Sequence, residues 1–167
     1  MICFEYLNKP EFPAVANKIF DILADNMGKI APTGNTRAED FRCWYEAVAD
    51  GLKKEQRQIV LIKDEEDIIG FFQYYTNENT FMMEEIQFKP EYQGTKVFRN
   101  LFGFLIENIG ENPEFTEAYA NTENLKSTGI LRHLGLSEVG MNKNGRSFHF
   151  RGRYRDLVKW YKESSEK

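Results

Sequence analysis

Hydrophobic and polar residues alternate in some stretches of the chain and recur at helical spacing in others, which predicts strands and helices in turn. Residues 2–7 alternate as a short strand, and apolar residues three or four apart then predict an amphipathic helix over 12–27. The later elements follow from the same patterns: a helix over 36–52, strands over 57–63, 68–76 and 80–89, a helix over 95–108, a strand over 115–121, a helix over 125–134, strands over 139–141 and 147–154, and a helix over 155–167.

Short motifs mark where several of these elements begin and end. Thr36 and Glu39 have the spacing of a capping box, in which a hydroxyl and a carboxylate satisfy free N–H groups at a helix start. Gly135 is typical of a helix C-cap, and Asn144-Gly145 is typical of a tight hairpin turn. Four acidic residues at 64–67 predict an exposed turn between two strands, with cation binding as the other interpretation.

The length of 167 residues suits one domain, and the chain shows no internal repeat and no linker. We therefore expect a single mixed α/β domain over 1–167. A content of 41% hydrophobic and 29% charged residues excludes disordered and collagen-like classes. A net charge of −4 argues against a protein that coats nucleic acid.

The sequence has no apolar run near the ~18 residues of a membrane span, and its N-terminal segment lacks the pattern of a signal peptide. The two cysteines, Cys3 and Cys43, are too few for a disulfide framework and are expected to be free thiols. These features favour a cytoplasmic protein with no membrane partner.

One strand-to-helix junction stands out as a candidate binding site. Residues 86–94, IQFKPEYQG, end a strand and lead through Gly94 into the strongly apolar helix over 95–108. The first N–H groups of a helix have no partner within it, and with the helix dipole they form a cradle for a phosphate or pyrophosphate.

This junction resembles the cofactor-binding motif of the GNAT N-acetyltransferase superfamily. In that family a strand of hydrophobic-x-hydrophobic-x-Pro type leads into a Gln/Arg-x-x-Gly-x-Gly/Ala loop and a helix. A second signature follows in the proper order, because NLKS at 124–127 and LRHLGL at 131–136 are similar to the family's Asn-x-x-Ala helix and its closing Gly-containing turn. The resemblance implies a GNAT-like α/β fold with a mixed, mostly antiparallel sheet of about seven strands flanked by helices.

The resemblance also implies acetyl-CoA as the acyl donor, without a metal. Its pantetheine arm would lie along 84–88, and the backbone N–H of Phe88 would hold the thioester oxygen as an oxyanion donor. Asn124 would cap its helix and contact CoA. The pyrophosphate would meet the residues at the junction: Gln93, Gly94, Thr95, Lys96, Val97, Phe98 and Arg99.

The sequence departs from the family pattern at four positions. Lys96 and Phe98 stand where the family has small residues; Phe98 either blocks the cradle or turns inward, as its spacing favours, and Lys96 and Arg99 offer cations to the phosphates instead. Met82 and Leu131 stand where many members have a carboxylate and a tyrosine acid.

Other residues are candidates for the missing acid and base. Glu84 shares a strand face with Met82 and is the candidate base, directly or through water, whereas Glu85 competes if the register is shifted by one residue. Tyr119 is the candidate acid, with a packed or cleft-lining ring as the alternative. His133 is expected to be structural or exposed.

The sequence therefore predicts an N-acetyltransferase that moves an acyl group from acetyl-CoA to a primary amine of a small molecule or protein. The alternative is a GNAT-fold binding protein that has lost catalysis, with or without CoA affinity. A basic stripe over 147–155 (Arg151, Arg153 and Arg155) is either a surface for an anionic substrate, a nucleic acid or an acidic partner, or a solvated face. The net charge opposes the nucleic-acid interpretation. The C-terminal hairpin and helix would allow a homodimer.

Overall fold

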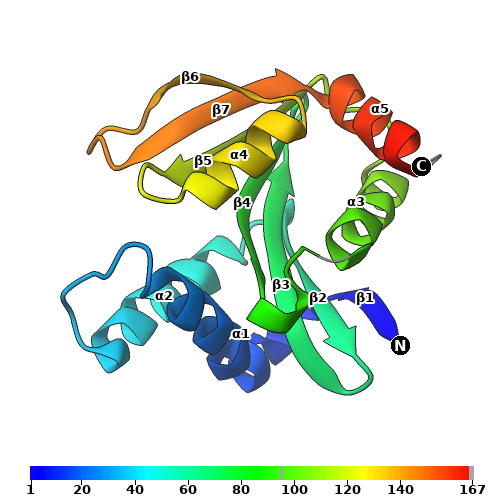
Figure 1. Ribbon diagram of the computed structural model, residues 1–167. Helices are drawn as coiled ribbons and strands as arrows, with labels where there is room; N and C mark the ends of the chain where they lie inside the picture. Colours follow the sequence, from blue (N-terminus) through cyan, green and yellow to red (C-terminus); the bar gives the residue numbers. More distant parts are fainter. Residues whose placement is uncertain (95, 166–167) are drawn as a thin grey trace. The chain divides into compact units, whose positions relative to one another are not determined.

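The computed structural model describes residues 1–94 and 96–165 and contains the predicted elements in the predicted order (Figure 1). The helices and strands are β1 (Ile2–Tyr6), α1 (Phe12–Met27), α2 (Arg37–Gly51), β2 (Arg57–Asp64), β3 (Asp67–Thr76), β4 (Thr80–Phe88), α3 (Lys96–Ile109), β5 (Phe115–Asn121), α4 (Leu125–His133), β6 (Ser137–Met141), β7 (Ser147–Arg153) and α5 (Tyr154–Ser165). Two 3-10 turns, Lys9–Glu11 and Pro90–Tyr92, precede α1 and follow β4. Within the described ranges, no helix is both long and apolar enough to cross a membrane.

The strands form one sheet in the order β1-β2-β3-β4-β5-β7-β6. The β1–β2, β5–β7 and β6–β7 pairs are antiparallel, and β4–β5 is parallel. A mixed, mostly antiparallel sheet of seven strands is therefore confirmed. The parallel ladder is short, because it pairs only Thr80–Met83 of β4 with Phe115–Ala118 of β5.

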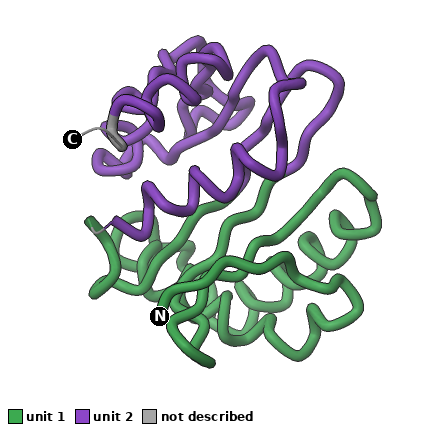
Figure 2. The backbone as a smooth tube through the Cα atoms, turned by 90° about the vertical axis from the view of Figure 1, so that its right-hand side faces the viewer, with its two compact units in different colours: residues 1–74, 85–94 green, residues 75–84, 95–167 purple. Residues whose placement is uncertain are grey.

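The chain divides into two compact units (Figure 2). Unit 1 contains residues 1–74 and 85–94, and unit 2 contains residues 75–84 and 95–167. Because β3 and β4 each pass from one unit into the other, the two units share these strands rather than being joined by a linker.

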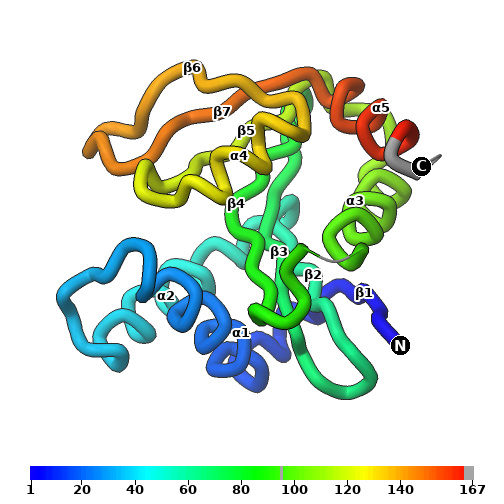
Figure 3. Tube along the Cα trace, viewed as in Figure 1, coloured from blue at the N-terminus to red at the C-terminus, as the bar shows by residue number. Residues whose placement is uncertain are grey.

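In unit 1, α1 and α2 pack on each other, and their chain path is followed in Figure 3. Their apolar faces bury a cluster with the inner face of β2 and β3, in which Ile19 and Phe71 are fully buried. Aromatic rings fill the contact between the helices, with Phe12 stacked on Tyr45 at 5.2 Å between ring centroids. The capping box at the start of α2 is confirmed, since Thr36 Oγ1 accepts from Glu39 N at 3.2 Å and Glu39 Oε2 accepts from Thr36 N at 2.9 Å.

In unit 2, helices cover one face of the β5–β7 pair. This face carries the fully buried Phe150 of β7, and the Arg132 guanidinium of α4 lies 5.3 Å from its ring centroid. Helix α4 ends as predicted, because Gly135 has a φ of +98° and Leu136 N donates to Leu131 O at 3.0 Å. Helices α3 and α5 approach so closely that a Cβ on Gly103 would lie 2.4 Å from Tyr161 Oη.

Loss of the capping box gives a direct test of the unit 1 fold. Thr36→Ala removes the side-chain acceptor at the start of α2, and we expect it to lower the free energy of unfolding by about 1 kcal/mol in urea denaturation. Thr36→Ser keeps an equivalent acceptor and should stay close to the wild type. Equal stability of the two variants would contradict the cap.

Candidate active site

The end of β4 is held by side chains from elsewhere in unit 1. Phe88 is buried, and its carbonyl accepts hydrogen bonds from Asn26 Nδ2 at 2.8 Å and from Gln93 Nε2 at 3.1 Å. The next residue, Lys89, donates its N–H to Ile69 O of β3 at 2.8 Å. Gly70 makes this approach possible, since a Cβ there would lie 2.6 Å from Gln87 O. These contacts fix the strand at Phe88, the predicted oxyanion donor.

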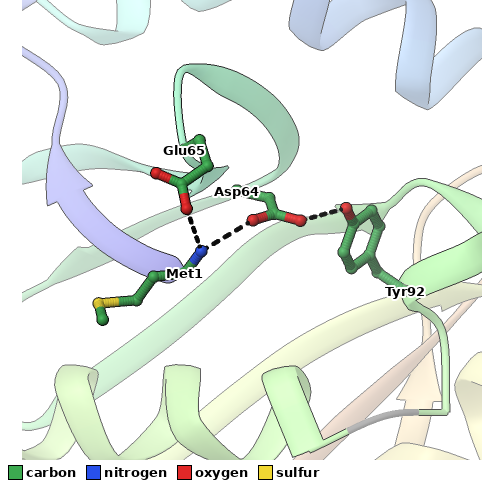
Figure 4. A network of polar contacts seen from close by, with 4 residues as sticks. All are labelled: Met1, Asp64, Glu65 and Tyr92. Carbon is green, nitrogen blue, oxygen red and sulfur yellow. Dashed lines mark hydrogen bonds and ion pairs between the residues drawn. The ribbon is translucent and has the colours of Figure 1, made fainter.

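The turn after β4 is tied to the acidic turn between β2 and β3 (Figure 4). Tyr92 donates its hydroxyl to Asp64 Oδ2 at 2.7 Å, and the α-ammonium of Met1 donates to Asp64 Oδ1 at 3.2 Å and Glu65 Oε1 at 2.6 Å. The Tyr92 hydrogen bond, followed by that of the α-ammonium, lowers the pKa of Asp64. The same bond to Asp64 raises the pKa of Tyr92. The predicted exposed turn therefore holds the turn after β4 through Tyr92.

The predicted phosphate cradle begins at an open glycine. Gly94 has a φ of +73°, and no atom lies within 4 Å of the place where a Cβ would stand. Gln93, the first residue of the motif, turns its side chain back to Phe88 O. Thr95 lies outside the described residues, and α3 begins at the exposed Lys96.

The other side chains at the start of α3 pack within unit 2. Val97 is buried, and the ring of Phe98 lies 5.0 Å from Phe102 and 6.2 Å from Trp160, measured between centroids. Phe98 thus packs with aromatic neighbours, as its helical spacing favoured. The Arg99 guanidinium lies 4.6 Å from the centroid of Tyr161, so this predicted phosphate ligand has a partner on α5.

Asn124 has the capping role that the sequence predicts. Its Oδ1 accepts from Ser127 N at 3.0 Å at the start of α4. Leu131 is buried on the same helix, and His133 lies edge-on to Trp160 at 6.2 Å. Leu131 and His133 therefore both have structural surroundings.

The catalytic candidates of unit 2 lie on the sheet face opposite Phe150. Met82 is the register partner of Glu117 across the β4–β5 ladder, and strand alternation places Glu84 on the same face. Tyr119, two residues beyond Glu117, shares this face and is 48% exposed. In unit 1, Glu85 instead has the Gln87 amide as a partner, with Nε2 to Oε1 at 2.7 Å. The face therefore carries both Glu84 and Tyr119.

The sequence reasoning missed a polar pair on this face. His149 Nε2 lies 2.7 Å from Glu117 Oε1, and the His149 ring is stacked on Tyr119 with centroids 4.6 Å apart and planes 12° apart. Alternation alone indicated the face of each residue. The pairing of β5 with β7, which brings them together, has no local signal in the sequence.

The predicted basic stripe is wrong in its third member. Arg155 belongs to α5, because β7 ends at Arg153. The other two arginines lie against β5 residues and the turn before them: the Arg151 guanidinium is 3.7 Å from the Phe115 centroid, and Arg153 forms an ion pair with Glu114 at 2.9 Å. These local partners favour the interpretation as a solvated face.

No protein-family model and no curated protein sequence matches the chain. Solved structures do match. The PaiA N-acetyltransferase of Thermoplasma acidophilum, in complex with coenzyme A, aligns with a TM-score of 0.73 and 15% identity, over 92% of this chain and 99% of its own. A Desulfovibrio desulfuricans protein assigned to the GNAT family aligns with a TM-score of 0.70 and 15% identity, over 92% and 99%.

This chain has the GNAT fold. A third GNAT-fold structure, spermidine N-acetyltransferase of Vibrio cholerae with CoA and spermine, aligns with a TM-score of 0.61 and 15% identity, over 94% of this chain and 98% of its own. The fold that the two sequence motifs implied is therefore confirmed over most of the chain. At these identities the comparison concerns the fold, and the roles of individual GNAT residues rest on this chain's own chemistry.

The bond between Tyr92 and Asp64 predicts a pH-dependent contribution to stability. A carboxyl with a lowered pKa stabilises the fold above its unfolded value of about 4 and loses this effect as the pH falls through its folded value. A phenol with a raised pKa stabilises the fold at pH values below its unfolded pKa of about 10. This effect is lost as the pH rises through the pKa of the folded state. Tyr92→Phe should therefore lower the free energy of unfolding most near neutral pH, and the difference from the wild type should narrow towards about pH 3 and about pH 11.

Tyr45→Phe is the matched control, because within the described residues the Tyr45 side chain packs on apolar and aromatic neighbours and no hydrogen bond of its hydroxyl is found. Its difference from the wild type should stay constant with pH. Urea denaturation across the pH range measures both variants. A pH-independent loss in Tyr92→Phe would contradict the assigned bond.

Proposed function

We propose that this protein is an acetyl-CoA-dependent N-acetyltransferase that transfers an acetyl group to a primary amine. The observation that carries the proposal is the fold match over 92% or more of the chain to proteins named as acetyltransferases, two of them crystallised with coenzyme A. The amine is that of a small molecule or of a protein, and the acetyl group passes by direct attack of the amine on the thioester.

The main chain around the end of β4 would hold the acyl donor. The backbone N–H of Phe88 would hold the thioester oxygen, and the arm of the donor would run along Glu84–Phe88, which lie beyond the ladder with β5. Acetyl-CoA supplies the activated acetyl group. The fixed end of β4 supports this role, since an oxyanion donor works only when its position is set in advance.

The start of α3 would meet the pyrophosphate through its backbone N–H groups. The open Gly94 fits this role, because a main chain without a covering side chain allows close approach of a phosphate. Phe98 also fits, since its ring lies against Phe102 and Trp160. Lys96 is exposed and offers the cation, whereas Arg99 lies over Tyr161. Gln93, Thr95 and Val97 would contact the pyrophosphate through their backbone. Asn124 would be a further contact to CoA.

Proton transfer would use the face of unit 2 opposite Phe150. The acceptor ammonium has to lose a proton before it attacks, and the departing thiolate has to gain one. Glu84 on β4 would be the base, directly or through water, and His149 on β7 is a second proton acceptor on the same face. Tyr119 carries an exposed hydroxyl and is the candidate proton donor to the thiolate.

Charge reversal at Lys96 tests the position of the phosphate site. Lys96→Glu places a carboxylate at a helix start beside bound phosphates, and we expect it to weaken acetyl-CoA binding about tenfold in calorimetry. Arg153→Glu is the matched control, an exposed charge reversal on β7, and should bind as the wild type does. Equal losses in both variants would indicate a general charge effect and contradict the placement.

Turnover tests the function itself. The wild type should bind one acetyl-CoA per chain and release free thiol when given spermine or a short peptide with a free α-amino group and one lysine. Thermal shift or calorimetry without any response at saturating acetyl-CoA would contradict the proposal. Binding without thiol release on a broad amine panel would instead identify a CoA-binding protein that has lost catalysis.

A further inference from the structure

Glu117 and His149 form a hydrogen-bonded, largely buried pair on the β5–β7 ladder. Their side chains are only 17% and 25% exposed, and Nε2 and Oε1 lie 2.7 Å apart. The register pairs Tyr119 with His149 and Glu117 with Arg151, so the imidazole reaches diagonally from β7 to the Glu117 carboxylate on β5. On its other side, the register partner of His149 is Gly140 of β6, which has no side chain to cover the ring.

The hydrogen bond to Glu117 decides which imidazole nitrogen holds the proton. An ionised carboxylate only accepts hydrogen bonds, so Nε2 of His149 carries the hydrogen of the neutral ring. Nδ1 then keeps its lone pair, and within residues 1–94 and 96–165 no hydrogen-bond partner of Nδ1 is found. In this arrangement a carboxylate orients the imidazole and the second ring nitrogen can accept a proton. Both features are typical of a general base.

An aromatic ring covers one face of the imidazole. Tyr119 stacks on one face of the imidazole at 4.6 Å, and a π face attracts a cation. The next cation on the strand, Arg151, has its guanidinium over Phe115 at 3.7 Å. Met82, where the sequence lacks an expected carboxylate, is the register partner of Glu117. Beside Met82, the Glu117 carboxylate of β5 is therefore the group that holds His149 by a hydrogen bond.

We propose that His149 is the catalytic base of the acetyl transfer and that Glu117 is its positioning residue; this inference rests on the function proposed above. Nδ1 of His149 takes a proton from the acceptor ammonium. The freed nitrogen lone pair forms the C–N bond with the acetyl carbon, and the electrons of the C–S bond leave on the CoA sulfur. That thiolate takes a proton from the Tyr119 hydroxyl, which solvent restores, and the second amine proton passes to solvent.

Kinetics of two histidine variants test the base. The protein has two histidines, so His133→Ala on α4 is the matched control. With acetyl-CoA and the best amine of the panel, His149→Ala should lower kcat about 100-fold or more, with KM for acetyl-CoA unchanged within about threefold. Added imidazole should restore part of the kcat of His149→Ala. His133→Ala should stay within about twofold of the wild type.

Glu117→Gln tests the positioning role through a readout independent of turnover. Long-range ¹H–¹⁵N NMR of the wild type should show the neutral His149 ring protonated at Nε2, and Glu117→Gln should show a mixture of both tautomers together with about tenfold lower kcat. An active wild type whose kcat survives His149→Ala, or whose loss imidazole does not rescue, would overturn the inference and leave the proposed function standing. A wild type that binds acetyl-CoA but releases no thiol would overturn both.

Discussion

The proposed function depends on the place where β4 stops. Pro90 follows the strand, and the carbonyl of Phe88 is taken by Asn26 of α1 and by Gln93 of the following turn. Because the carbonyl is held from two directions, the peptide group between Phe88 and Lys89 has a fixed orientation, next to the peptide that carries the Phe88 N–H. A fixed strand end is the condition for an oxyanion donor. The hydrogen bond between Tyr92 and Asp64 also holds the turn that follows the strand.

Unit 2 carries two different kinds of sheet surface. One face of β5 and β7 is apolar and is covered by helices around Phe150. The other face presents Glu117, Tyr119 and His149, three side chains that are polar or partly exposed. The same backbone ladder therefore carries the core on one side and the face proposed for proton transfer on the other. Strand alternation alone produces this division.

Local sequence patterns predicted the helices and strands well. Features that depend on pairing between distant strands could not be predicted in this way. The helix ends at Thr36 and Gly135 carry their own signals, so they could be read directly from the sequence. The spacing of Phe98 also favoured the packing position that it occupies against Trp160. Alternation wrongly extended the strand to Tyr154 and the basic stripe to Arg155, because the residue types still alternate there. The strand ends earlier because Tyr154 is buried and donates its backbone N–H to Glu114 and its hydroxyl to Gly110, which are tertiary contacts.

The candidate site could be predicted only where its residues are close together in the sequence. The junction at 86–99 lies in one stretch and could be recognised, whereas the pair of Glu117 and His149 comes from strands 32 residues apart. A ¹⁵N-HSQC titration with coenzyme A tests directly whether the cofactor binds at the end of β4. The largest shifts should fall on the amides of Phe88, Gly94 and residues 96–99. Unchanged spectra at saturating coenzyme A, or shifts confined to other segments, would contradict the account.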